Sequence, residues 1–584
     1  MSQAPHPRLP DRWIGPTGRP LCRCAMRRVR CILARYLSGG ARMIEFQRAS
    51  GRRKAVIMGS VMLGLFVSAV DQTVVSTAMP RIVAQLGGLS LFSWVFTAYM
   101  LTSTTSVPIV GKLGDLYGRK LFFMAGIAFF MAASMLAGLS QTMLQLIVFR
   151  GVQGLGAGMI MANAFTIIGD FFPPAERAKY QGLFAAVFGL ASICGPTIGG
   201  TITDNLSWRW VFYVNVPVGL VALPVLWFAL PGRRAGGVQR PVDWAGVLTL
   251  TAGVVPLLLA LVWGGNELAW TSPQILGLLI TAAVMTALFV LAEARAQEPL
   301  LPLPLFRNRI VSVCLLVVFV VGVGMFGVTV FMPLFVQGVT ASSATASGVV
   351  TLPMMLGMVV MSNIAGQIVS RTGRYRVMAI SGIVVALLGL LLLSRMDTGT
   401  SRVEIVRNMM IIGTGMGMTM PIFNVAVQNA VPYSMLGVAT SAVQFFRSLG
   451  GTMGVALLGT VLTNRLRPEL ARSLPTDIAQ QAPAELVAQL RDPQTLLNPE
   501  RFALVRQGFL ALGADGQELF LRAVASTRVA LGNALSHVFL IGTVIVFCGL
   551  LCSFLLREIP LRRTHEPRHA PDEATEGRIP VPLD

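Results

Sequence analysis

GKLGDLYGRK occupies residues 111–120, and a related stretch, GQIVSRTGRYR, occupies residues 366–376. Each stretch follows a long apolar segment and combines glycines with basic residues, about 255 positions apart. Glycine allows tight turns, and basic residues between apolar segments are typical of loops at a membrane surface. The pair therefore indicates that one structural unit occurs twice in this chain.

Two further matches repeat at nearly the same separation. RGVQGLGAGMIM begins at Arg150 and RNMMIIGTGMGM at Arg407, and this alignment pairs Gly156 with Gly413 and Gly158 with Gly415. Farther along the chain, three glycines match three others: Gly182, Gly195 and Gly199 with Gly437, Gly450 and Gly454. Three matches at one offset predict two parallel copies of a six-helix unit, an arrangement that places a substrate site between the copies near the middle of the membrane.

The apolar segments around these matches predict an all-α integral membrane protein. Hydrophobic residues make up 54% of the 584 residues and charged residues 12%, against about 25% charged in soluble proteins. About 20 apolar residues cross a bilayer as a helix, because lipid cannot satisfy an open backbone. We expect fourteen spans, as 6+2+6, at 54–76, 91–111, 121–140, 143–168, 181–203, 210–230, 244–263, 274–294, 310–333, 346–369, 376–394, 404–428, 436–463 and 532–556.

The net charge of +21 reflects membrane topology rather than a nucleic-acid partner. Most basic residues in short loops, such as Lys112, Arg119 and Lys120, fall on the side that alternating spans assign to the cytoplasm. This distribution predicts a cytoplasmic membrane protein with both termini in the cytoplasm.

The spans predict five segments along the chain. The first 50 residues are Arg- and Pro-rich with no signal-peptide core. They are either a cytoplasmic tail that binds anionic lipid or, in the simpler interpretation, partly a mis-called extension over residues 1–42, because Met43 offers an alternative start. The predicted segments are a basic cytoplasmic tail (1–53), an N-terminal six-helix bundle (54–232), two inserted linker helices (243–295), a C-terminal six-helix bundle (308–557) with a long outer loop (464–531), and a cytoplasmic C-terminal tail (558–584).

These motifs resemble the major facilitator superfamily, and more narrowly its fourteen-spanner drug:proton antiporters, over residues 54 to 556. The loop at 111–120 is similar to the superfamily's signature loop, with Leu116 in place of a frequent arginine. The resemblance implies a conformational latch in which an aspartate accepts hydrogen bonds from basic side chains or a helix N-terminus. The matching residues are Gly111, Asp115, Gly118, Arg119 and Lys120.

GLASICGPTIGG at 189–200 resembles the motif associated with antiporters in this superfamily. Its matching residues are Gly182, Gly195, Pro196, Gly199 and Gly200, with Ala191 where a glycine is common. Small residues allow close helix packing, and proline bends a helix. Alone, the motif indicates only a kinked packing helix; with the resemblance, it favours export over import.

Charged residues inside predicted spans are the candidate coupling residues, because a buried charge costs at least about 2.5–3.5 kcal/mol at a span centre and usually marks an ion pathway. Asp71 is expected to bind a proton or attract a cationic substrate, with a structural hydrogen bond as the alternative; aligning the halves places Gly324 opposite it. The family resemblance gives Arg150 a part in proton transfer, through the proton affinity of a nearby carboxylate or a held water. Arg447 either pairs across the cavity or approaches the inner surface.

Other polar residues receive simpler interpretations. Asp170, Asp243, Glu267 and Glu293 lie near span ends and are expected to be solvated. Polar residues expected in the substrate cavity are Gln72, Asn163, Asn363, Asn424, Gln428 and Gln444. The chain has no phosphate-binding G-x-x-x-x-G-K-[ST] loop, metal-ligand pattern or nucleophile elbow, so we expect no enzyme, cofactor or metal, with a proton gradient as the energy source.

The sequence therefore predicts a proton-driven exporter of small amphiphilic, cationic or zwitterionic compounds. The nearest alternative is a dedicated exporter of one metabolite, such as an antibiotic, siderophore or amino acid. A more distant alternative is a non-transporting receptor or scaffold. In a cell with an outer membrane, the loop at 464–531 would be the contact for a periplasmic adaptor, although an ordinary surface loop is the simpler interpretation.

Overall fold

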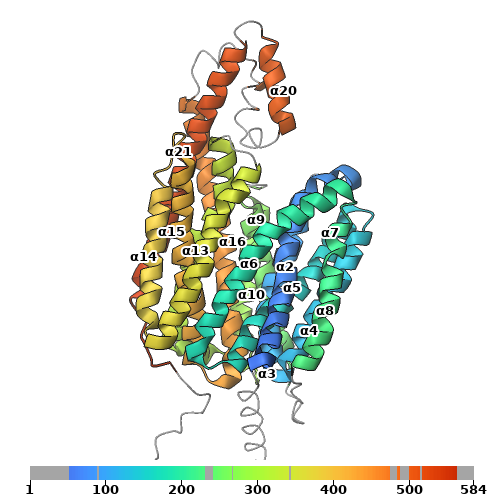
Figure 1. The fold of residues 1–584 in the computed structure, drawn as a ribbon, viewed down its shortest axis with the longest axis vertical. Helices are drawn as coiled ribbons and strands as arrows, with labels where there is room; N and C mark the ends of the chain where they lie inside the picture. Colours follow the sequence, from blue (N-terminus) through green and yellow to red (C-terminus); the bar gives the residue numbers. More distant parts are fainter. Residues whose placement is uncertain are drawn as a thin grey trace, which may run out of the picture. The chain divides into compact units, whose positions relative to one another are not determined.

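The structure, a computed structural model, is helical over nearly all the residues that it describes (Figure 1). These are residues 51–87, 91–230, 241–265, 268–340, 344–473, 499–512 and 516–561, with positions 483, 485, 486 and 489. By internal contacts the chain divides into Met1–Ala55 and Val56–Asp584, and the features below lie in the second unit. The predicted N-terminal tail and most of the C-terminal tail lie outside the described residues.

The helices follow the predicted order. The first half contains α2 (Gly51–Leu86), α3 (Phe92–Tyr117), α4 (Arg119–Leu139), α5 (Met143–Phe171), α6 (Pro174–Asn205), α7 (Trp210–Tyr213) and α8 (Asn215–Ala229). The inserted pair is α9 (Trp244–Trp263) and α10 (Pro273–Arg295). The second half contains α11 (Leu303–Arg307), α12 (Arg309–Leu334), the π-helix η2 (Phe335–Val339), α13 (Ala344–Thr372), α14 (Tyr375–Leu393), α15 (Arg402–Ala430), the 3-10 helix η3 (Tyr433–Met435), α16 (Leu436–Ser473), α20 (Pro499–Leu510) and α21 (Gly516–Ser553).

Thirteen helices of the described chain are long and apolar enough to cross a membrane. The helix at the second predicted span, α3, is present but is not among the thirteen. Its centre carries the run TSTTS at 102–106, and its last turns carry Lys112 and Asp115. A helix with this much polar surface needs protein neighbours, and α3 contacts α5, α9 and α16.

The long outer loop contains more helix than predicted. α16 continues to Ser473, and α21 begins at Gly516, before the expected span starts at 532. Between them, α20 packs beside the extension of α21, through Val505, Phe509 and Phe520 (Figure 1). Part of the predicted loop is therefore a small apolar cluster formed by α20 and the extension of α21.

Equivalent turns join equivalent helices in the two halves. α3 ends at Gly118 with φ 103°, and α13 is followed by Gly373 with φ 72°. Residues with a Cβ rarely adopt these positive angles, which explains a glycine at both positions.

Helix packing repeats as well. α5 contacts α3 and α4, as α15 contacts α13 and α14, and α4 contacts α8 as α14 contacts α21. Between the halves, α3 contacts α16 and α6 contacts α13. Because α3 corresponds to α13 and α6 to α16, the first contact is the counterpart of the second, as expected for two related bundles.

The contacts correct one predicted register. In α5, added Cβ atoms on Gly154 and Gly158 would meet α3, and one on Gly156 would meet α4. In α15, Gly413 and Gly417 approach α13 as Gly154 and Gly158 approach α3, and Gly415 approaches α14 as Gly156 approaches α4. The predicted pairing of Gly156 with Gly413 is therefore wrong by two residues, and Arg407 is not the counterpart of Arg150.

The glycines of α6 and α16 make matching close approaches. A Cβ on Gly199 would come within 3.0 Å of the Val74 carbonyl oxygen in α2. One on Gly454 would come within 2.8 Å of Val323 Cα in α12. Backbones this close require a residue without a side chain, whereas a Cβ on Gly200 would meet nothing within 4 Å.

The inserted helices contact both halves through α9. α9 packs against α3 and α16, and α10 packs against α9. Lys112 of α3 forms an ion pair of 2.9 Å with Glu298, just beyond α10, and Trp270, before α10, donates to Thr460 of α16 at 3.0 Å. The inserted helices and the residues next to them therefore contact one helix of each half, α3 and α16.

Candidate functional site

A buried polar cluster surrounds Asp71 within the first half. Asp71 is 1% exposed in α2, and its carboxylate contacts Arg150 and Gln153 of α5 and Asn215 of α8. Ser134 of α4 completes the cluster. Four helices therefore bring their buried polar side chains to one point.

Three donors hold the carboxylate. Arg150 Nη1 donates to Asp71 Oδ2, while Gln153 Nε2 and Asn215 Nδ2 donate to Oδ1 at 2.8 and 2.9 Å. Gln153 also accepts from Arg150 at 2.7 Å. Ser134 accepts from Gln153 and Asn215 and donates to the Phe212 carbonyl at 2.8 Å. A buried charge is tolerated when it is paired and hydrogen-bonded in this way.

Arg150 is itself fully buried. The centre of its guanidinium lies 4.3 Å from the centroid of the Tyr99 ring, a favourable position for a cation. Its Nε is buried and has no hydrogen-bond partner among the described residues. One donor of the cluster is thus left over within the described part of the chain.

The second half packs tightly where the first half has this cluster. A Cβ on Gly324, the residue aligned with Asp71, would come within 2.9 Å of the Gly542 carbonyl oxygen in α21. α21 corresponds to α8, which supplies Asn215. The polar cluster is therefore a property of the first half, not of the repeated unit.

The signature loop forms a second cluster, which joins the two halves. Asp115 accepts from the backbone N–H groups of Gly437 and Val438, at 3.2 and 3.0 Å, in the first turn of α16. Arg119 pairs with Asp115 at 2.8 Å and also with Asp170 of α5. The positive end of the α16 dipole and the Arg119 cation together stabilise the Asp115 carboxylate.

Two glycines permit this contact. A Cβ on Gly111 would come within 3.2 Å of the Gly437 carbonyl oxygen and overlap Ser441, and one on Gly437 would overlap the Asp115 carboxylate. Tyr433 adds a hydrogen bond of 2.5 Å to Asp170. α3 and α16 can therefore touch here only because both carry glycine.

A further contact between the halves involves Arg177 at the start of α6. Its guanidinium donates to the carbonyls of Gly169 and Phe172 and, at 3.3 Å, to Gln428 of α15. Gln428 in turn donates to Thr440 of α16 at 2.9 Å. The structure thus places Gln428, a predicted cavity residue, in a hydrogen-bonded junction of α6, α15 and α16.

Lys120 does not join Asp115 and Arg119. Its ammonium donates to the Trp227 carbonyl in α8, at 2.5 Å. The signature loop therefore has two faces: Asp115 contacts α16 and Arg119 contacts α5, whereas Lys120 contacts α8.

Arg447 of α16 is a half-buried cation for which no ion pair is found among the described residues. It donates to Gln444 and, at 3.4 Å, to the sulfur of Met420, and it lies 5.8 Å from the centroid of the Phe165 ring in α5. It also borders a crevice of about 20 Å³ between α12, α15 and α16, enough for a water molecule. The described neighbours of Arg447 are therefore an amide, a thioether and an aromatic ring, not a carboxylate.

The other predicted cavity residues do not form one cluster. Asn163 and Asn363 donate to carbonyls of their own helices at 2.9 Å. Gln72 is exposed on α2 beside buried Asp71. Asn424 Oδ1 and Gln444 Nε2 are buried without partners in the described part of the chain.

Several site residues were missed or misplaced from sequence. Gln153 lies inside the quoted stretch that begins at Arg150, and Asn215 lies inside the apolar segment at 210–230. An isolated polar residue in a predicted span is the signal that could have found each of them. The prediction of solvation is wrong for Glu293, which is buried; Asp170 and Asp243 are only partly buried, and Glu267 lies outside the described residues. Asp170 pairs with Arg119, Asp243 caps α9 through Gly246, and Glu293 is 3% exposed and accepts from Leu300 and Leu301. Within the described ranges no group of three or more His, Cys, Asp or Glu could hold a metal.

Comparison with known proteins agrees with this architecture. The model of the Major Facilitator Superfamily matches residues 61–455. Multidrug transporter protein MdtP of Bacillus subtilis (strain 168) is 42% identical over 522 residues, 87% of this chain and 94% of that protein. Multidrug resistance protein 3 of the same strain is 43% identical over 413 residues, 70% of this chain and 80% of that protein.

A solved structure shares the fold. The crystal structure of the human organic anion transporter MFSD10 (TETRAN) has a TM-score of 0.55 and 13% identity, covering 84% of this chain and 99% of that one. Because the family model matches more than half of the chain and the relatives are similar over most of their length, the chain belongs to the major facilitator superfamily of membrane transporters.

Proposed function

We propose that this chain exports amphiphilic, drug-like compounds across the cytoplasmic membrane in exchange for protons. The observation that carries the proposal is the buried Asp71 carboxylate, held by Arg150, Gln153 and Asn215. A buried acid in a membrane helix usually marks a proton or ion pathway. The names of the bacterial relatives, both multidrug proteins, support drug-like substrates.

Protonation of Asp71 is the proposed coupling step. A proton on the carboxylate removes its negative charge and weakens the ion pair with Arg150. Arg150, with its spare Nε donor, then turns to other acceptors, which alters the contact of α2 with α5. Loss of the proton restores the pair, so the two charge states favour different arrangements of the first half.

In the second part of the proposed mechanism, the contacts of Asp115 and Arg177 control whether one end of the protein is open. Both join the halves at the end predicted to face the cytoplasm. With these contacts in place, the end predicted to face the cytoplasm would be closed, and release of the α3–α16 contact would open it. The halves would then rock against each other around a site between them, as in other transporters built from repeats.

The substrate would bind among groups left unsatisfied by the protein. Asn424 Oδ1 and Gln444 Nε2 are buried without partners in the described chain, and Arg447 is a cation without a described carboxylate partner. Met420 and Phe165 beside Arg447 supply apolar surface that adapts to different ligands. This combination favours amphiphilic compounds that carry a polar or zwitterionic group.

Proton-driven efflux from proteoliposomes tests the proposal. Wild-type protein should move ethidium against its gradient when a proton gradient is imposed, and Asp71→Asn should abolish this movement while the protein remains inserted. Asp397→Asn, at an exposed aspartate, is the control and should transport normally. Normal proton-driven efflux by Asp71→Asn would reject the coupling role. Transport of one compound from a broad panel would support a dedicated exporter, and no transport of any would support a scaffold.

A further inference from the structure

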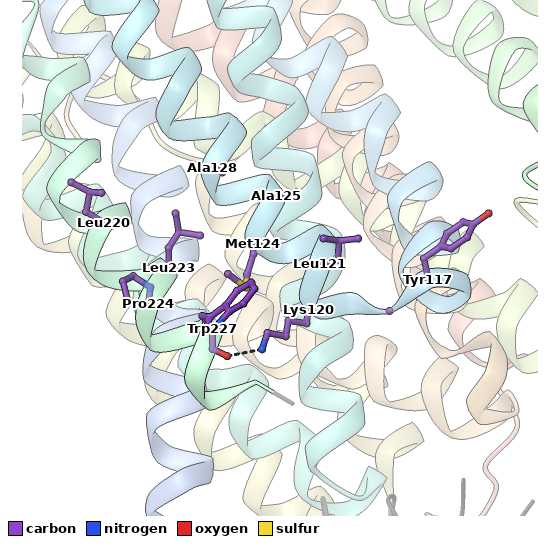
Figure 2. A pocket seen from close by; sticks show the side chains of 11 residues that line it. Tyr117, Lys120, Leu121, Met124, Ala125, Ala128, Leu220, Leu223, Pro224 and Trp227 are labelled. Carbon is purple, nitrogen blue, oxygen red and sulfur yellow. Dashed lines mark hydrogen bonds between the residues drawn. The ribbon is translucent and has the colours of Figure 1, made fainter. Parts of the chain in front are cut away.

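A groove runs between α4 and α8 on the surface of the first half. Its volume is about 710 Å³, and its walls include Leu121, Met124 and Ala128 of α4 and Leu220, Leu223 and Trp227 of α8 (Figure 2). Pro224 lies within α8 along the groove, where it interrupts the backbone hydrogen bonds of that helix. The groove is large enough for a flexible apolar chain.

The groove opens onto the surface that faces lipid. Leu121, Leu220 and Trp227 line it and are 64%, 59% and 61% exposed. Large apolar side chains with this exposure on membrane helices contact hydrocarbon. Lipid molecules are therefore the ligands nearest to the groove.

One end of the groove is positively charged. Lys120 lines this end, and its ammonium lies 5.0 Å from the centroid of the Trp227 ring (Figure 2). An ammonium has three N–H donors, and the described contact with the Trp227 carbonyl uses one. The first turn of α4 also lines this end, so its backbone dipole adds to the positive potential.

We propose that this groove binds an anionic phospholipid of the cytoplasmic leaflet. The headgroup phosphate would lie against Lys120, and an acyl chain would lie between α4 and α8. Two features select this occupant: a cation at one end with apolar walls along the rest, and a predicted topology that places Lys120 on the side where anionic lipids attract basic residues. A cationic drug would be repelled by Lys120.

The site is separate from the latch contact although the two share one loop. Arg119 contacts Asp115 and Asp170, whereas the adjacent Lys120 contacts α8. Changing Lys120 therefore removes the proposed headgroup contact and leaves the described contacts of the Asp115 cluster in place.

Quenching of tryptophan fluorescence tests the proposal with the full-length protein. The protein is reconstituted in dioleoylphosphatidylcholine vesicles that contain increasing amounts of phosphatidylglycerol with dibrominated acyl chains, and Trp227→Phe identifies the signal of Trp227. Dibrominated phosphatidylglycerol should quench Trp227 at lower mole fractions than dibrominated phosphatidylcholine. Lys120→Gln should weaken this preference about fivefold, the effect of one basic residue near an anionic surface. Lys120→Arg should retain it.

Two further variants make the result specific. Arg376 of α14 donates at 2.8 Å to the carbonyl of Phe554, directly after the end of α21, much as Lys120 does to Trp227 in the first half, but it does not line the groove. Arg376→Gln should therefore leave the preference unchanged. Ala128→Phe, at an exposed position in the groove wall, should reduce quenching of Trp227 without changing any charge.

Three results would overturn the proposal. These are equal quenching by the two brominated lipids, an unchanged preference in Lys120→Gln, and an equal loss in Arg376→Gln. Soluble glycerophosphoglycerol, added as a competitor, should not displace the lipid. If it does, the site binds a phosphate group without needing the acyl chain, and the lipid assignment fails.

Discussion

The Asp115 carboxylate at the end of α3 accepts a hydrogen bond of 3.0 Å from the Val438 N–H in the first turn of α16. These residues belong to different halves of the chain, and their contact joins the halves at one end. A carboxylate at a helix N-terminus contributes up to about 2 kcal/mol in a partly buried setting. The Asp115 charge therefore contributes to the contact between the halves at this end, beside the contacts of Arg177 and Tyr433.

Asp115→Asn should favour the state in which this end is open. Loss of the charge weakens the contacts with α16 and Arg119, by about 1–2 kcal/mol, or roughly 5- to 30-fold in the ratio of closed to open molecules. Distances between spin labels placed on α3 and α16 would measure this ratio. Glu518→Gln, in an exposed ion pair of α21, should leave the distances unchanged. An unshifted distribution in Asp115→Asn would show that the contact does not set the equilibrium.

Gly199→Ala should destabilise the protein, and Gly200→Ala should not. A methyl group on Gly199 would press on Val74 of α2, whereas one on Gly200 has open space. Overpacking costs about 1–3 kcal/mol, while Ala in an open helix position gains up to about 1 kcal/mol over Gly. Thermal unfolding in detergent compares the two. Equal melting temperatures would contradict the close approach of α2 and α6.

Asp71→Asn and Arg150→Gln should each destabilise the first half, and the double variant should be less destabilised than the sum of the two. Removing one member of a buried ion pair leaves an uncompensated charge and costs about 3–5 kcal/mol. Removing both leaves neutral groups that hydrogen-bond among themselves. A double-mutant cycle on unfolding measures the coupling. Additive effects would show that the pair does not act as a unit.

Arg447→Gln should impair transport without destabilising the protein. Arg447 is a half-buried cation with no ion pair among the described residues, so a neutral side chain removes a desolvation cost. We expect lower efflux of zwitterionic substrates, a smaller effect on purely cationic ones, and a melting temperature equal to or above that of the wild-type protein. Arg447→Lys, which keeps the charge, should retain part of the activity. Equal losses for both substrate classes would argue against contact between Arg447 and an anionic group.

The sequence predicted the helices well because bilayer thickness and backbone hydrogen bonding leave few alternatives. It also predicted a close approach at Gly195 and Gly199, and the structure shows both glycines against α2. It was wrong about the register of α5 and α15, because glycines at every second position match equally well after a shift of two residues. Only the neighbouring helices decide which glycine faces which helix.

The candidate site was predicted in part. Asp71 and Arg150 stand out as charges inside apolar spans, but Gln153, Asn215 and Ser134 are neutral and common in such helices. Asp170 lies near a helix end, where solvation is the usual outcome; its contact with Arg119 depends on how α3, α4 and α5 meet. Likewise, the different partners of Arg119 and Lys120 depend on the helices around the loop, not on the loop itself.

Proton release on substrate binding tests the central claim most directly. Ethidium is added to purified protein in weakly buffered detergent solution, and the pH of the solution is recorded with an indicator dye. The account predicts that wild-type protein and Asp397→Asn release protons when ethidium binds, and that Asp71→Asn binds ethidium without release. Equal proton release by Asp71→Asn would contradict the account, because another group would then carry the proton.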